Sequence, residues 1–167
     1  MHREISIVDE TDGVSGIEYP DYFAELYVAG LMAHAGWNIY FPHRDRGLDF
    51  IASKTGADRH QIIRPVQVKG KYPEVDKTNK KDYGFVGRLN QIHPDMVLAM
   101  PFFAGADFAP PVFVAFMPYA AIKPHKRGYR CQPAYFKDGR PFPKPNCSRY
   151  IGKAGLDLIE RSDALIR

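Results

Sequence analysis

Residues 47–70 read GLDFIASKTGADRHQIIRPVQVKG, and this stretch decides the fold of the chain. Two apolar segments, 48–53 and 62–69, lie on either side of a polar loop that contains Gly56 and Asp58. Strand-length apolar segments separated by such a loop are typical of a β-hairpin. We therefore expect two neighbouring antiparallel strands here.

The register of this hairpin follows from the centre of its loop. If the loop centres on Asp58, Asp49 lies opposite Gln67, and directly opposite residues of an antiparallel pair project to the same face. Lys69 is two residues from Gln67 and shares its face, whereas the valines on either side of Gln67 point into the core. Pro65 cannot donate to the ladder, so a bulge that shifts the register by one residue stays open. The pattern predicts a carboxylate, an amide oxygen and an ammonium on one face.

The segments on either side of the hairpin complete an α/β pattern. Residues 20–35 have apolar side chains at helical spacing, Pro20 and Asp21 suit the first turn of a helix, and Gly36 suits its end. The order of elements predicts a mixed β-sheet flanked by helices. The remaining expected elements are strands at 4–8, 37–41, 96–100 and 112–116, a short helix at 85–92, a final helix at 153–166, and polar connections at 9–16 and 71–84.

The size and composition of the chain suit a single soluble domain with its core at about 20–122. Of its 167 residues, 45% are apolar and 25% are charged, which is typical of a globular protein. Four prolines interrupt the apolar stretch 96–122, and this favours two buried strands over a membrane-spanning helix. The N-terminus has no apolar signal segment, and two cysteines are too few for a disulfide framework. We expect a cytoplasmic protein with reduced thiols.

Residues 123–149 differ from the rest of the chain in charge. They hold eight Lys or Arg against one acid, Asp138, a net charge of +7 in a chain whose total is +4. Four Tyr or Phe side chains are interleaved, and basic and aromatic residues together favour nucleic-acid contact over an inert loop. Because the segment is rich in proline, we expect an extended arm and not another packed layer. The residues predicted to contact nucleic acid, as opposed to forming solvated turns, are Arg44, Arg46, Lys71, Lys126, Arg127 and Arg130.

The polar residues inside the apolar segments predict a metal site, because ionisable groups are unusual in the core of a small domain. Oxygen ligands suit a hard divalent cation, Mg²⁺ or alternatively Mn²⁺. Asp49 would anchor the metal, and Glu25 on the first helix would bind it through water. The side-chain oxygen of Gln67 and the backbone carbonyl of Val68 would be neutral ligands. Lys69 would orient or deprotonate an attacking water and offset charge in the transition state.

At these residues the chain resembles the PD-(D/E)XK nuclease superfamily, and in particular the branch related to Mrr-type restriction endonucleases and archaeal Holliday-junction resolvases. The resemblance covers roughly residues 20–100. It implies a restriction-endonuclease-like fold and Mg²⁺-dependent hydrolysis of phosphodiester bonds in DNA. The residues that match are Glu25 on a helix, the segment 47–49, and Gln67, Val68 and Lys69 followed by Gly70. The resemblance also implies that Glu25, Asp49, Gln67 and Lys69 form the catalytic site.

Gln67 stands where most of that superfamily has an acid, although the Mrr-like branch also uses Gln. The exchange removes one negative charge, so we expect lower metal affinity. A catalytically inactive module that still binds nucleic acid is therefore the main alternative, and a structural or toxin-neutralising protein partner is a third. The three residues could also have no functional role: Glu25 would then face solvent, Asp49 would be a turn residue and Lys69 would extend to water. DNA versus RNA, the kind of cleavage, and monomer versus homodimer stay open.

Overall fold

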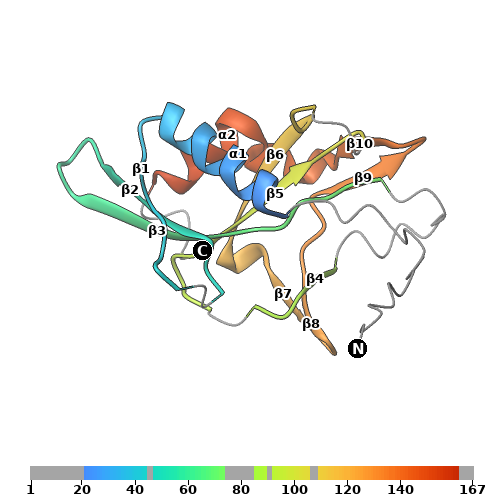
Figure 1. The fold of residues 1–167 in the computed structure, drawn as a ribbon, viewed down its shortest axis with the longest axis horizontal. Coiled ribbons are helices and arrows are strands. Elements are labelled where there is room, and N and C mark those ends of the chain that lie inside the picture. The colour runs from blue at the N-terminus through green and yellow to red at the C-terminus, as the bar shows by residue number, and fades with distance from the viewer. Residues whose placement is uncertain (1–20, 45–46, 74–84, 90–91, 106–108, 162–167) are drawn as a thin grey trace, which may run out of the picture.

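We describe the protein from a computed structural model, in which residues 21–44, 47–73, 85–89, 92–105 and 109–161 are described (Figure 1). The elements in chain order are α1 Asp21–His34, β1 Asn38–Tyr40, β2 Phe50–Thr55, β3 Gln61–Val68, β4 Phe85–Gly87, β5 Val97–Phe102, β6 Phe113–Pro118, the 3-10 helix η2 Tyr119–Ala121, β7 Lys123–His125, β8 Gly128–Arg130, β9 Ala134–Lys137, β10 Arg140–Pro143, the 3-10 helix η3 Pro145–Tyr150, and α2 Gly152–Ile159.

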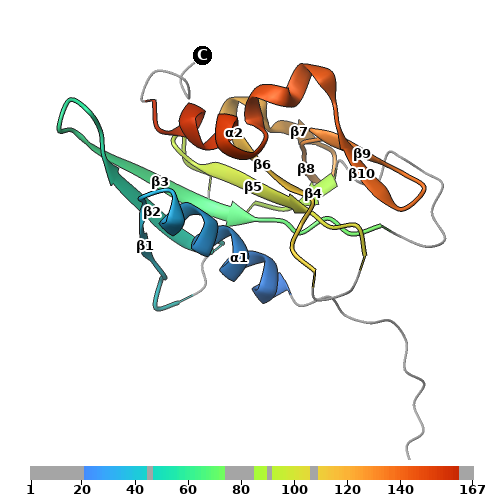
Figure 2. The ribbon, with the colours of Figure 1, turned by 90° about the horizontal axis from the view of Figure 1, so that it is seen from above.

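A mixed β-sheet of five strands, in the order β1-β2-β3-β5-β6, forms the centre of the fold. β3 and β5 are parallel, and the other neighbours are antiparallel. β5 is buried along its whole length and β6 along nearly all of it, which explains why both read as continuous apolar segments. The mixed α/β class expected from the sequence is confirmed, and Figure 2 shows α1 and α2 crossing the same face of this sheet.

The helices cover one face of the sheet and create the first apolar core. On α1, Ala24, Val28, Ala29 and Met32 are buried, and this spacing places them on the face that meets the sheet. They pack with side chains from β2, β3, β5 and β6 and with Leu156 and Ile159 of α2. Gly36, which ends α1, has φ +89°, as expected for a glycine at this position.

A second apolar core lies on the opposite face of the sheet. Leu98, Met100 and Phe102 of β5 pack there against Ile122 and Phe136 from the later part of the chain. The backbone elements on this side are a three-stranded sheet, β4-β8-β7, and the hairpin β9–β10. In Figure 1, β7 and β8 extend away from the five-stranded sheet on the side opposite the two helices.

The structure corrects three expectations. Residues 85–87 form a strand, β4, where a short helix was expected, because they pair with β8. Residues 123–149 are not an extended arm: they contain the hairpins β7–β8 and β9–β10 and most of η3, and Cys131, Ala134 and Phe136 are buried in the second core. α2 ends at Ile159, so residues 160 and 161 of the expected final helix are not helical.

Other expectations are confirmed or lie outside the described residues. The helix at 20–35 and the strands at 37–41, 96–100 and 112–116 occur within a few residues of the expected bounds. Cys131 and Cys147 are free thiols. Within the described residues, neither α-helix has the length and apolar character to cross a membrane. The expected strand 4–8, the linker 9–16, most of the loop 71–84 and the end of the final helix at 162–166 lie outside the described residues.

Candidate functional site

The hairpin β2–β3 has the register expected from its sequence. Phe50 pairs with Val66 and the ladder continues to Thr55 with Gln61, so the strands are symmetric about residue 58. Pro65 pairs with Ile51 and causes no shift. The ladder thus starts one residue after Asp49, and among the described residues no strand residue of β2 pairs with β3 beyond Val66.

The carboxylate of Asp49 binds the backbone of β3 just beyond the end of this ladder. Its Oδ2 accepts a hydrogen bond of 2.5 Å from the backbone N–H of Val68, and its own N–H donates to the carbonyl of Val66 at 3.0 Å. A carboxylate offers two oxygens and about four lone-pair sites, so this bond is compatible with coordination of a cation. In an extended strand the N–H and C=O of one residue point to the same side, so the Val68 carbonyl is directed to the side on which Asp49 lies.

Gln67 is the buried polar residue of the candidate site. Its side chain is only 6% exposed, and within the described part of the chain its Oε1 has no hydrogen-bond partner. A buried polar group without a partner costs about 1–3 kcal/mol and is uncommon in folded proteins. The side-chain oxygen therefore has an unused acceptor position beside the segment that Asp49 holds.

The two faces of β3 separate the core from the candidate site as expected. Val66 and Val68 point into the first core, under α1. Gln67 pairs with Leu98 of β5 and so shares its face, on which the second core lies. Lys69 continues the strand through a hydrogen bond of 2.9 Å from its N–H to the carbonyl of Ala99, and its side chain is half-buried.

Glu25 lies on the other side of the sheet. On α1 it precedes Val28, Ala29 and Met32 at the spacing of the buried stripe, and it is half-buried, so a fully solvent-facing Glu25 is excluded. Its neighbour Ala24 lies against Gly70, where an added Cβ would come within 3.4 Å of the Ala24 side chain. α1 therefore packs next to the end of the strand that carries the site.

The geometry brings Asp49 next to the segment 67–69 and places Glu25 on the opposite face from Gln67. A cation that all of them share would have to lie at the end of β3, beyond the ladder with β2. Among the described residues, no three His, Cys, Asp or Glu side chains are grouped to hold a metal ion. The proposed ligand set contains only two carboxylates, because an amide and a backbone carbonyl supply the other oxygens.

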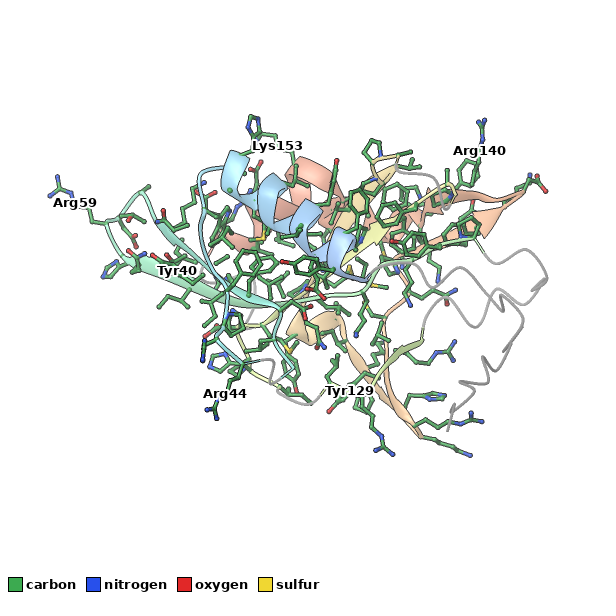
Figure 3. The ribbon with its side chains drawn as sticks, viewed as in Figure 1. Tyr40, Arg44, Arg59, Tyr129, Arg140 and Lys153 are labelled. Atoms are coloured by element: carbon green, nitrogen blue, oxygen red, sulfur yellow. The ribbon has the colours of Figure 1, made fainter. Side chains whose placement is uncertain are left out.

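The residues predicted to contact nucleic acid fall into different environments. Arg44, Lys126 and Arg127 are exposed, and Arg130 is half-buried in β8. Lys71 is also half-buried and forms an isolated bridge with Phe102, so it belongs partly to the sheet. Arg46 lies outside the described residues. In Figure 3, Arg44 and Tyr129 point to the side away from the helices, whereas Arg59, Arg140 and Lys153 lie elsewhere on the surface.

The sequence interpretation did not single out Arg64, which has a structural role. Its guanidinium is buried and lies between β3 and α2, where Nε donates to the carbonyl of Ile159 at 2.9 Å. Burial lowers the pKa of Arg64, and Asp95, whose Oδ1 is 3.7 Å from Nη1, opposes that change. A charged residue between apolar neighbours in 62–68 was the signal that could have revealed it.

Comparisons with models of protein families, with curated proteins and with solved structures found no match for this chain.

Proposed function

We propose that the protein is a nuclease with a restriction-endonuclease-like fold, which uses Mg²⁺ to hydrolyse phosphodiester bonds in DNA. The observation that carries this proposal is the buried Oε1 of Gln67, which has no partner among the described residues and lies one residue from the N–H that Asp49 holds. A carboxylate, an amide oxygen and a backbone carbonyl at one strand end form a ligand set suited to a hard cation. The mixed sheet and the order of the site residues along it support the same interpretation.

Each residue has a distinct part in the proposed mechanism. A divalent cation held by these residues would polarise the scissile phosphate and make an attacking water more acidic. Asp49 anchors the cation and holds Val68, so that the carbonyl of Val68 and the side chain of Gln67 keep their positions. Lys69 orients the attacking water and offsets negative charge that develops in the transition state. Glu25 would bind the cation through water from the side of α1.

The decisive experiment measures cleavage of plasmid, linear, branched and single-stranded DNA with Mg²⁺, Mn²⁺ or EDTA. Asp49→Asn keeps an oxygen that can accept from Val68 but removes the charge, and Lys69→Met removes the ammonium. We expect each variant to cleave at least about a hundred-fold more slowly than wild type, which corresponds to the loss of one transition-state contact. Lys153→Met is the matched control, because Lys153 is exposed on α2 and pairs only with Asp157 among the described residues.

Cleavage by Asp49→Asn and Lys69→Met at the wild-type rate would refute the proposal. The alternative function is a nucleic-acid-binding module of the same fold without catalysis, and Gln67 in place of an acid favours it. Calorimetric titration with Mg²⁺ and Mn²⁺ separates the two, because the inactive module has no metal binding that depends on Asp49. Melting curves of all variants would test whether each of them is folded.

A further inference from the structure

We propose that the β7–β8 hairpin docks duplex DNA through contacts between its Lys and Arg side chains and the phosphate backbone. The inference rests on the proposed function for its substrate class, and it assigns DNA binding to a part of the molecule that is separate from Asp49 and Gln67.

The charge of the hairpin is uniformly positive. Lys123, Lys126, Arg127 and Arg130 lie within eight residues, and there is no Asp or Glu from residue 123 to residue 137. All residues of 123–127 are exposed. Within the described part of the chain, Lys123, Lys126 and Arg127 form no ion pair, so their charge is not neutralised by the protein there. A group of exposed cations of this kind attracts a polyanion such as DNA.

The hairpin is held in a defined position by β4. Gly87 pairs with Tyr129, and β4 pairs along β8 in the three-stranded sheet β4-β8-β7. At Gly128, whose φ is +149°, an added Cβ would lie 2.2 Å from the carbonyl oxygen of Gly87. The two backbones are therefore so close that only glycine fits at residue 128. A preorganised hairpin presents its cations without an ordering cost at the moment of binding.

The hairpin and the candidate site lie on the same side of the five-stranded sheet. Gln67 shares its face with Leu98, and Leu98 packs in the core that contains Val86 of β4 and Ile122, the residue before β7. In Figure 3, Arg44, from the loop that leads to Asp49, points to the same side as Tyr129 of the hairpin. One duplex that lies across this side would contact the hairpin and pass the end of β3.

The composition of the hairpin favours duplex over single-stranded DNA. Proteins that bind single strands stack bases on aromatic side chains. The turn residues Lys126 and Arg127 and the adjacent His125 offer cations and an imidazole, and the one larger ring, Tyr129, packs against the second core. Duplex DNA has one phosphate for about every 1.7 Å of its axis, the higher density of negative charge. A two-stranded β-ribbon also fits the major groove of B-DNA, which is about 12 Å wide.

The test measures the affinity for a 20-bp DNA duplex in EDTA at several salt concentrations, so that cleavage does not contribute. For the double variant K126A/R127A we expect the slope of log K against log [salt] to decrease in magnitude by about 2, because each phosphate contact contributes roughly 0.9. We expect affinity at about 0.1 M salt to fall on the order of 10- to 100-fold. The control R59G/K153A removes the same charge from the far end of β2–β3 and from α2, and its slope should equal that of the wild type.

Several results would overturn this inference. It fails if K126A/R127A keeps the wild-type slope, or if the control loses as much affinity, since net charge alone would then explain binding. It also fails if single-stranded DNA or duplex RNA binds more tightly than duplex DNA and its binding depends on Lys126 and Arg127. None of these results affects the nuclease proposal, which metal-dependent cleavage decides. Conversely, a protein that binds duplex DNA through the hairpin but cleaves nothing would retain this inference and lose the proposed function.

Discussion

The carboxylate of Asp49 accepts a hydrogen bond of 2.5 Å from the backbone N–H of Val68. The two residues are 19 positions apart in sequence and meet where the ladder between β2 and β3 has ended. One side chain thus replaces the next rung of the ladder. It also joins the acidic residue of the proposed metal site to the strand that carries Gln67 and Lys69.

This bond should contribute to stability as well as to function. We expect Asp49→Ala to lower the free energy of unfolding by about 1–3 kcal/mol, because the half-buried N–H of Val68 loses its acceptor. Asp49→Asn keeps an acceptor oxygen and should cost less. Urea unfolding monitored by circular dichroism measures both. Equal losses for the two variants would show that the charge of Asp49, and not its role as acceptor, supports the strand.

Gln67 should limit stability in favour of function. Gln67→Leu removes a buried oxygen that has no partner in the described part of the chain, so we expect the free energy of unfolding to stay unchanged or rise by up to about 2 kcal/mol. Mg²⁺ should raise the melting temperature of the wild type, since a ligand that binds only the folded state stabilises it, and this rise should disappear in Gln67→Leu. Gln61→Leu, at the exposed end of the same strand, is the control and should retain it. A Gln67→Leu variant that is strongly destabilised and still responds to Mg²⁺ contradicts the prediction.

Gly128 should tolerate no side chain. In Gly128→Ala the methyl group would meet the carbonyl of Gly87 at 2.2 Å, so β4 and β8 must separate, at a cost of about 1–3 kcal/mol for overpacking. Gly139→Ala is the control: its φ is also positive, +74°, but no atom of the described residues lies within 4 Å of the added methyl group. The control should cost only about 1–2 kcal/mol for its backbone conformation. Thermal unfolding compares the two, and a smaller loss in Gly128→Ala than in Gly139→Ala would refute the close approach.

The two thiols should react at different rates. Burial raises the pKa of Cys131 to about 12, and this side chain is 4% exposed, whereas Cys147 is half-buried. At pH 8 a thiol reagent should modify Cys147 in the folded protein and both thiols in guanidinium chloride, because the thiolate is the reactive form. Rapid modification of both thiols in the folded state would show that Cys131 is accessible.

The same pKa predicts how stability depends on pH. Because the folded-state pKa of Cys131 is higher than its value of about 9 in the unfolded chain, its contribution to stability is complete below pH 9 and is lost as the pH rises towards 12. The difference in unfolding free energy between wild type and Cys131→Ala should therefore decrease over this range. A constant difference from pH 8 to pH 11 would contradict the prediction.

Much of the candidate site could be predicted from residues 47–70. Local patterns carried this information: the loop centred on Asp58 set the pairing of β2 with β3, and alternation along β3 placed Val66 and Val68 in the core. The same holds for α1, which ends where Gly36 adopts a positive φ. In each case the deciding interaction lies within about 20 residues along the chain.

Local patterns were misleading where distant segments pair. Residues 85–87 became a strand because β8, about 40 residues later, supplies the hydrogen-bond partner. The Pro-rich segment 123–149 became part of the second core because Cys131, Ala134 and Phe136 meet the apolar face of β5. Proline and charge at neighbouring positions did not prevent this, since these strands are short and lie outside the five-stranded sheet.

The sequence by itself determined which chemical groups the hairpin β2–β3 presents and on which face each lies, because strand alternation and loop position are local properties. Only the tertiary structure decided that the oxygen of Gln67 is buried with no partner among the described residues, and that a positioned hairpin, β7–β8, carries the cations. Both depend on the elements that cover the second face of the sheet. Such packing depends on contacts between residues far apart in the chain, which no local pattern encodes.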